Sequence, residues 1–223
     1  GTTSSKSKFI PVSRESLNDC HLAVGKDLLA IYTHENPNSQ LFEGLSLRLG
    51  GSSKINELQN ISYYGDLSAI MIQNLPFWAE WRSTPSNDIA LLEDWEEKVE
   101  KISKQVSGQN ITSLFGVPSW MLVLVKKVLN ENSVTSLEEI WPNLELFCHG
   151  GVSYKPYSDS FKKILPKNCK LLETYNASEG FFAIQDRLDQ DGLLLMLEHG
   201  IYYEFIPISE FHGRKSKAIN LEK

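Results

Sequence analysis

Short apolar runs alternate with helical patterns in the second half of the chain, and this alternation constrains the fold more than any other feature. An apolar run from Ile111 to Phe115 is followed by a Gly-Val-Pro turn and a helical pattern from Ser119 to about Leu129. Two further runs, "LELFCHGG" and "CKLLETYNASEG", each end at a polar or glycine-containing loop. Apolar strands that alternate with helices pair in parallel. We therefore predict an α/β fold with a mixed, mostly parallel sheet flanked by helices.

Helical periodicity predicts two long helices before these strands. The first runs from Arg14 to His34, with an apolar face formed by Leu17, Cys20, Val24, Leu28 and Ile31. The second runs from about Asp88 to Val106, with an apolar face formed by Leu92, Trp95, Val99, Ile102 and Val106. Its carboxylates lie largely off that face, and we interpret them as a solvated helix surface. A short strand, Ser46 to Leu49, is predicted between the two helices.

A hairpin is predicted near the end of the chain. In "GLLLMLEHGIYYEFIPI", two apolar runs surround Glu198-His199-Gly200. Two apolar runs joined by a short loop that contains glycine are typical of antiparallel strands. We therefore expect an antiparallel part of the sheet here.

Composition limits the classes of partner and compartment. The 223 residues are 41% hydrophobic, which is sufficient for a buried core. A net charge of −6 argues against nucleic acid or an anionic membrane as a partner, because both require a basic face. The three cysteines lie far apart without metal-ligand spacing, which argues against a disulfide framework or a zinc site and indicates the cytoplasm. No apolar run reaches the ~18–20 residues that cross a bilayer.

Three loops follow the predicted strands, at Gly116-Val117-Pro118, at Gly150 to Ser153 and at Thr174 to Gly180. In parallel sheets, ligands lie beyond the carboxyl ends of the strands, where loops and helix N-termini present free N–H groups. The opening "GTTSSKSK" adds hydroxyls and lysines that can surround phosphate oxygens. It lacks the second glycine of the Walker A pattern, so a P-loop ATPase is not indicated. The alternatives are a nucleotide crevice and a merely disordered, hydroxyl-rich terminus.

"GTTSSKSK" and "TYNASEG" resemble the two nucleotide-binding motifs of the adenylate-forming superfamily, and more narrowly of the GH3 family of auxin-responsive acyl acid amido synthetases with its bacterial relatives. Further segments resemble this family in order and spacing: "YYGDLSAIMIQNLPFW", "LEDWEEKVEKI", "WPNLELFCHGGVSYKPY" and "IYYEFIPISEF". The resemblance covers nearly the whole chain. It implies the large N-terminal domain of an acyl-CoA synthetase-like enzyme.

The resemblance also implies roles for individual residues. The loop that grips the β- and γ-phosphates of ATP would be formed by Thr2, Thr3, Ser4, Ser5 and Lys8. One wall of the adenine slot would be formed by Gly151, Val152 and Ser153. Tyr175 would cover the ring, and the residues near the base and the α-phosphate would be Asn176, Ala177 and Ser178. Glu179 would bind Mg²⁺, so Glu179 and Lys8 are the expected catalytic groups. The acyl pocket could draw on Tyr64, Trp120, Phe181 and Phe182.

The reaction implied by the resemblance is ATP-dependent adenylation of a small carboxylic acid, followed by acyl transfer to the amine of an amino acid. Transfer to the thiol of coenzyme A and a non-catalytic nucleotide-binding remnant are the alternatives. The ribose-binding motif and the C-terminal domain of the family would follow Lys223. Residues 1–223 are therefore expected to be part of the N-terminal adenylation domain, beginning at the phosphate-binding loop and inactive in isolation.

Overall fold

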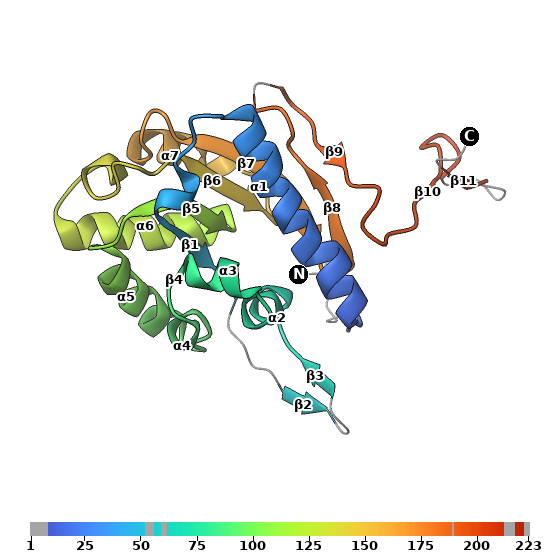
Figure 1. The fold of residues 1–223 in the computed structure, drawn as a ribbon, viewed down its shortest axis with the longest axis horizontal. Coiled ribbons are helices and arrows are strands. Elements are labelled where there is room, and N and C mark those ends of the chain that lie inside the picture. Colours follow the sequence, from blue (N-terminus) through green and yellow to red (C-terminus); the bar gives the residue numbers. More distant parts are fainter. Residues whose placement is uncertain (1–8, 52–55, 59–61, 189, 212–216, 221–223) are drawn as a thin grey trace.

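The computed structural model describes residues 9–51, 56–58, 62–188, 190–211 and 217–220. At its centre is a seven-stranded sheet with strand order β4-β1-β5-β6-β7-β8-β9 (Figure 1). The strands are β1 (Leu45–Leu49), β4 (Ser83–Thr84), β5 (Ile111–Gly116), β6 (Leu146–Gly150), β7 (Lys170–Ala177), β8 (Gly180–Ile184) and β9 (Leu194–Leu195). Five neighbouring strands run parallel, namely β4, β1, β5, β6 and β7. Strand β8 is antiparallel to β7, and β9 is antiparallel to β8. The predicted mixed, mostly parallel sheet is confirmed.

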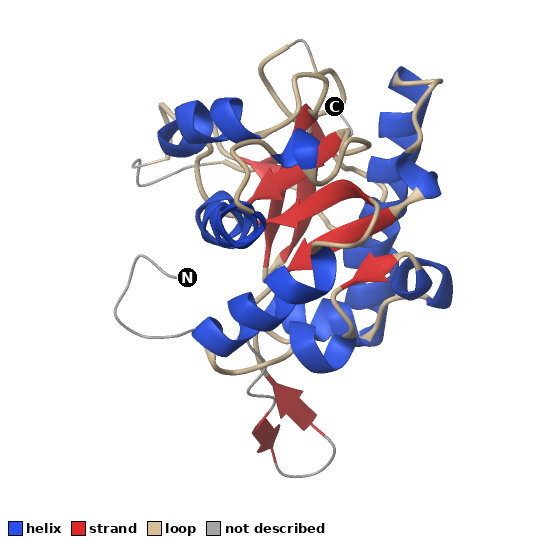
Figure 2. Cartoon of the chain, turned by 90° about the vertical axis from the view of Figure 1, so that its left-hand side faces the viewer, coloured by secondary structure: helices blue, strands red, loops and turns tan. Residues whose placement is uncertain are grey.

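Helices cover both faces of this sheet (Figure 2). The α-helices are α1 (Ala23–Glu35), α2 (Leu67–Gln73), α3 (Phe77–Trp81), α4 (Asn87–Ala90), α5 (Trp95–Val106), α6 (Pro118–Asn132) and α7 (Ser158–Ile164). The π- and 3₁₀-helices are η1 (Ser16–Leu22), η2 (Leu41–Glu43), η3 (Leu137–Glu139) and η4 (Lys155–Tyr157). None of the helices in the described ranges is long and apolar enough to span a membrane.

Two apolar clusters hold these layers together. Successive strand residues face opposite sides of a sheet, and neighbouring residues of β6 accordingly belong to different clusters. Phe147 packs in the first cluster, between the sheet and α5, α6 and α7. Cys148 packs in the second cluster, between the sheet and the continuous helix formed by η1 and α1. The middle strands β5 and β6 are thus buried on both faces, as expected for a parallel sheet.

The predicted helix from Arg14 to His34 is confirmed, with one local difference. Its first part, Ser16–Leu22, is π-helical, and the α-helical part follows from Ala23 to Glu35. Leu17 and Cys20 are buried as predicted. Near the other end, Tyr32 rather than Ile31 is fully buried. The tyrosine hydroxyl donates to Glu145 Oε1 at 3.1 Å, which fastens this end of α1 beside the start of β6.

The predicted helix from Asp88 to Val106 is two helices, α4 and α5. The helix breaks because Asp94 has an extended backbone (φ −72°, ψ 118°) and caps α5, its Oδ1 accepting from the Glu97 N–H at 2.7 Å. The carboxylates of this region are exposed, as predicted for a solvated surface, and Glu97 pairs with Lys101 at 2.7 Å. An N-cap signal inside an apolar periodicity therefore divided one pattern into two helices.

Replacing the Asp94 cap by alanine is expected to lower the free energy of unfolding by about 1 kcal/mol, because one N–H of the first turn of α5 loses its acceptor. Urea unfolding followed by circular dichroism measures this change. Asp94→Asn is the matched control, since its amide oxygen still accepts the bond and should preserve most of the stability. Equal destabilisation by alanine and asparagine would contradict the capping role.

The predicted hairpin around Glu198-His199-Gly200 is wrong. Strand β9 pairs with β8, where Leu195 lies opposite Ala183. The second apolar run forms β10 (Glu204–Phe205), which pairs with β11 (Ile219–Asn220). The two runs therefore find different partners, because β8 offers an unpaired edge close to β9. Another antiparallel pair, β2 (Asn56–Leu58) with β3 (Ser62–Tyr64), extends away from the sheet in Figure 1.

Candidate nucleotide-binding site

The loops after β5, β6 and β7 lie next to one another at the carboxyl edge of the sheet. Gly116 at the end of β5 lies opposite His149, and Gly150 at the end of β6 lies opposite Thr174. A Cβ atom placed on Gly151 would lie 3.4 Å from Cγ2 of Val117, so the first two loops are in contact range. The sheet therefore brings together the three loops that the sequence predicted to form a crevice.

The two glycines after β6 are required by the backbone. A Cβ on Gly150 would lie 2.5 Å from the Thr174 carbonyl oxygen, which is far inside van der Waals contact. Gly151 has φ +80°, a conformation that side chains with a Cβ rarely adopt. The turn then leaves Val152 and Ser153 exposed, so their side chains are open to a ligand at this edge.

Two neighbouring residues of strand β7 that are predicted to bind the nucleotide, Tyr175 and Asn176, point in opposite directions. Tyr175 is 55% exposed, and its ring rests on Phe182 at a centroid distance of 5.2 Å. Asn176 is half-buried, its Oδ1 lying 3.1 Å from Nδ1 of His21 and its Nδ2 3.7 Å from the sulfur of Met71. Tyr175 is thus free to cover a base. The predicted place of Asn176 near the base stays a prediction, and its side chain already has two partners within the protein.

Glu179 lies at the tip of the hairpin that joins β7 to β8. Ala177 pairs with Gly180, so Ser178 and Glu179 form a two-residue turn, and both are exposed. The described residues contain no cluster of three or more His, Cys, Asp or Glu side chains that could hold a metal by themselves. Mg²⁺ is commonly held by one or two carboxylates together with substrate phosphates. A single exposed carboxylate beside the nucleotide loops fits that mode of binding.

The opening loop with Thr2, Thr3, Ser4, Ser5 and Lys8 lies outside the described residues. The helix that follows it is anchored on the hairpin, because Cys20 Sγ accepts from the Phe181 N–H at 3.3 Å. His21 of the same helix contacts Asn176 on the other strand of the hairpin. The helix that follows the predicted phosphate loop is therefore joined directly to the hairpin that carries the predicted metal ligand, Glu179.

Buried titratable groups near this edge are packed rather than exposed to a ligand. The imidazole of His149 is 4% exposed and stacks on Tyr154 with ring centroids 4.5 Å apart. Burial lowers the pKa of His149 to about 4, so the ring is neutral at physiological pH. Burial also raises the pKa of the Cys148 thiol to about 12, which keeps this sulfur from acting as a thiolate nucleophile. Both residues belong to the packing of β6.

The aromatic residues considered for an acyl pocket do not gather in one place. Trp120 packs against Trp95 of α5 with ring centroids 5.7 Å apart, on the side of the first apolar cluster. Phe181 is buried in the second cluster, on the opposite face of the sheet. Phe182 lies against Tyr175, and the side chain of Tyr64 falls outside the part of the chain that the structure describes.

The sequence analysis missed Arg48, a charged residue inside β1. Arg48 lies opposite Phe115 in the sheet, and its Nε and Nη1 are buried without a hydrogen-bond partner among the described residues. Burial lowers the pKa of Arg48 to about 10, opposed by the charge of Glu80. The available signal was the strand "LSLRL", in which one arginine interrupts an apolar alternation.

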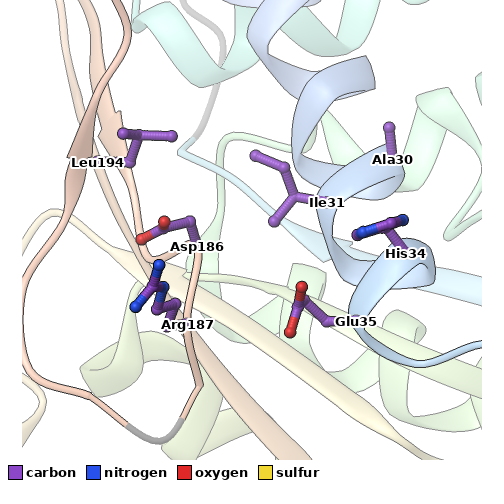
Figure 3. A pocket seen from close by; sticks show the side chains of 7 residues that line it. All are labelled: Ala30, Ile31, His34, Glu35, Asp186, Arg187 and Leu194. Carbon is purple, nitrogen blue, oxygen red and sulfur yellow. The ribbon is translucent and has the colours of Figure 1, made fainter.

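Two cavities lie elsewhere on the molecule. One of about 420 Å³ separates the C-terminal half of α1 from the segment after β8 (Figure 3). It is lined by Ala30, Ile31, His34, Glu35, Asp186, Arg187 and Leu194. A second, of about 300 Å³, lies beside Glu145 and Lys167 near the amino ends of β6 and β7. Neither is lined by a predicted nucleotide-binding residue, so the candidate site is the open carboxyl edge of the sheet.

One solved structure among the comparisons with known proteins shares this architecture. The solved structure described as GH3.15 acyl acid amido synthetase matches with a TM-score of 0.67 at 13% identity, covering 91% of this chain and 45% of that chain. A long-chain-fatty-acid-CoA ligase (FadD1) from Archaeoglobus fulgidus matches at a TM-score of only 0.36 with 14% identity, covering 76% of this chain and 31% of that chain. A search of curated proteins by sequence found no match.

The likeness to the amido synthetase at this identity is one of fold, and the chain spans less than half the length of that relative. The family match is more direct, because the model described as "GH3 family N-terminal domain" matches residues 1–170, well over half of the chain. The chain therefore belongs to the GH3 family.

Proposed function

We propose that the full-length protein is an ATP-dependent ligase that activates a small carboxylic acid as its acyl-adenylate and then transfers the acyl group to the amine of an amino acid. The observation that carries this proposal is the β7–β8 hairpin. It presents Tyr175 and Glu179, both exposed, at the edge where the Gly150-Gly151 turn permits close approach. Membership of the GH3 family supports the same reaction class.

In the activation step, an oxygen of the substrate carboxylate attacks the α-phosphorus of ATP. The bond between that phosphorus and the bridging oxygen to the β-phosphate breaks, and pyrophosphate leaves. No covalent intermediate with the protein is needed, and the buried Cys148 is not available for one. The protein instead has to hold the carboxylate in line with the α-phosphate, which makes the reaction effectively unimolecular.

The predicted residues divide this work among them. Tyr175 would stack on the adenine ring, and one wall of its slot would be formed by Gly151, Val152 and Ser153. The residues near the base and the α-phosphate would be Asn176, Ala177 and Ser178. Lys8 and the hydroxyls of the opening loop would bind the departing pyrophosphate. Glu179 would hold Mg²⁺, which when bound neutralises the charge that develops on the phosphate oxygens. Each role uses groups that attract or orient the nucleotide without being consumed.

The remaining assignments concern compartment and partners. Three free cysteines among the described residues agree with a reducing cytoplasm, where we place the protein. We propose small molecules as its partners, and the acidic net charge argues against nucleic acid and anionic membrane surfaces. Residues 1–223 are assigned to the N-terminal adenylation domain.

Carboxylate-dependent ATP–pyrophosphate exchange tests the proposal. The full-length protein is incubated with ATP, Mg²⁺, labelled pyrophosphate and a broad panel of acids, and label is expected in ATP only when an accepted acid is present. Reactions without acid are the control. A protein that binds ATP but gives no exchange with any acid would be a nucleotide-binding remnant, contrary to the proposal. Product analysis with amino acids or coenzyme A then identifies an amide or a thioester.

A further inference from the structure

We infer that Arg48 makes the acid site selective for dicarboxylic acids, one carboxylate being activated while the second meets the Arg48 guanidinium. This inference rests on the proposed adenylation and adds the chemical class of the acid. It starts from a half-buried arginine, Arg48, with two buried guanidinium nitrogens that have no hydrogen-bond partner, since buried polar groups in folded proteins usually have one.

The position of Arg48 places it beside the site of activation. In the sheet, Arg48 lies opposite Phe115, which in turn lies opposite Cys148. The next residue of β1, Leu49, pairs with Gly116 at the carboxyl edge. Arg48 is thus one residue inside the edge where the acid must meet the α-phosphate, and it stands on the face covered by η1 and α1.

The Arg48 guanidinium has two nitrogens without an acceptor within the described part of the chain. Its Nε and Nη1 atoms are buried and make no hydrogen bond there. Glu80 influences Arg48 through its charge, but its Oε1 accepts from Asn87 Nδ2 at 2.8 Å and no ion pair with Arg48 is formed. A guanidinium offers parallel N–H groups that match the two oxygens of a carboxylate. A ligand carboxylate would accept the hydrogen bonds that Nε and Nη1 of Arg48 do not make within the protein.

A second unmet polar group lies on the same face. His21 of η1 is fully buried, and its Nε2 has no partner among the described residues, although Nδ1 contacts Asn176. One helical turn later, a Cβ on Gly25 would meet no atom within 4 Å, so there is open space beside this helix. Unmet polar atoms and open space on one face indicate a polar ligand rather than a purely apolar tail.

Helix α2 covers the carboxyl edge of the sheet on the face that bears Arg48. The hydroxyl of Ser68 accepts from the Gly51 N–H at 2.8 Å at the end of β1, and Met71 contacts Asn176 at the end of β7. The helix therefore crosses the carboxyl edge from β1 to β7 on the face that bears Arg48. An acid held beneath α2 could reach the nucleotide with one end and Arg48 with the other. An acid with an apolar end would leave the buried cation unpaired, which is the basis for its rejection.

The test compares straight-chain dicarboxylic acids of increasing length with their monomethyl esters in ATP–pyrophosphate exchange by the full-length protein. Each ester keeps one carboxylate for activation and has nearly the same shape as its parent, but it lacks the second charge. For the length that fits best, the diacid is expected to exceed its ester in kcat/KM by about 10- to 100-fold. Arg48→Met should abolish this preference while exchange with the ester persists, and Arg48→Lys should reduce it partly.

Glu80→Gln is the matched control, since among the described residues it removes the acid whose charge acts on Arg48. It should retain the preference. If the protein exchanges with some acid but at equal rates for diacid and ester, the inference is overturned while the proposed function stands. The same holds if the preference for the diacid survives in Arg48→Met, or if Glu80→Gln loses the preference as fully as Arg48→Met does. Absence of exchange with every acid would instead overturn the proposed function. If Arg48→Met fails to fold, Arg48→Lys is used instead, provided that its melting temperature is unchanged. An undiminished preference of Arg48→Lys for the diacid over its ester would then overturn the inference.

Discussion

Replacing Glu179 by glutamine in the full-length protein is expected to lower kcat for acid-dependent ATP–pyrophosphate exchange by about 100- to 1000-fold. The carboxylate is exposed at the tip of the β7–β8 turn, and in the proposed role it holds Mg²⁺ together with the phosphates of the nucleotide. Charge on the phosphate oxygens is greatest as pyrophosphate departs. The loss should therefore appear in kcat much more than in the affinity for ATP.

The control for this variant is Glu173→Gln. Glu173 is an exposed carboxylate on the same strand, but it lies before the turn and opposite His149 rather than at the hairpin tip. Its replacement should leave kcat within about twofold of the parent, as expected for a surface change away from the site. Equal activity of Glu179→Gln and the parent would remove Glu179 from the metal-binding role.

Replacing Lys8 by alanine in the full-length protein is expected to cost on the order of 1–3 kcal/mol in the transition state, the size of a charge-assisted hydrogen bond. Lys8 lies outside the described residues, so this prediction rests on the opening motif. If Lys8 grips the β- and γ-phosphates, the variant should bind AMP with nearly unchanged affinity, because AMP lacks both groups. Exchange kinetics and calorimetric titration with AMP measure the two quantities on the same protein.

Lys6→Ala is the comparison within the same loop, and it separates a specific grip from a general loss of positive charge. A specific role for Lys8 predicts a smaller effect at Lys6 in the exchange assay. A fall in AMP affinity as large as the fall in turnover would show that the loop does not act on the pyrophosphate.

The central strands could be predicted from the sequence because their burial is visible in their composition. β5 and β6 are short, lack Asp, Glu, Lys and Arg, and end at a glycine, which is typical of buried parallel strands. Parallel pairing then places the ends of both strands at one edge, so the neighbouring loops at Gly116 and Gly150 could also be anticipated. The predicted crevice thus depended on local patterns that tertiary packing did not override.

The features that sequence reasoning missed are set by long-range contacts. The partner of β9 is decided by the free edge of β8, which no pattern near Leu194 reveals. The inward direction of Asn176 depends on His21, 155 residues earlier in the chain. Arg48 was overlooked because exposed arginines are common in strands, and only the sheet register shows that this one stands over a buried face. Such properties follow from what lies opposite a residue, which its neighbours in sequence do not specify.

The anchoring of η1 has a mechanical consequence for the nucleotide crevice. Cys20 and His21 fasten this helix to both strands of the β7–β8 hairpin, through Phe181 and Asn176 respectively. The helix is also continuous with α1, whose far end is tied to Glu145 before β6. We therefore expect that a tilt of the hairpin would move this helix, and with it the start of the chain segment that carries the predicted phosphate loop. In the proposed complex, binding of the base and binding of the phosphates would be mechanically coupled through one helix.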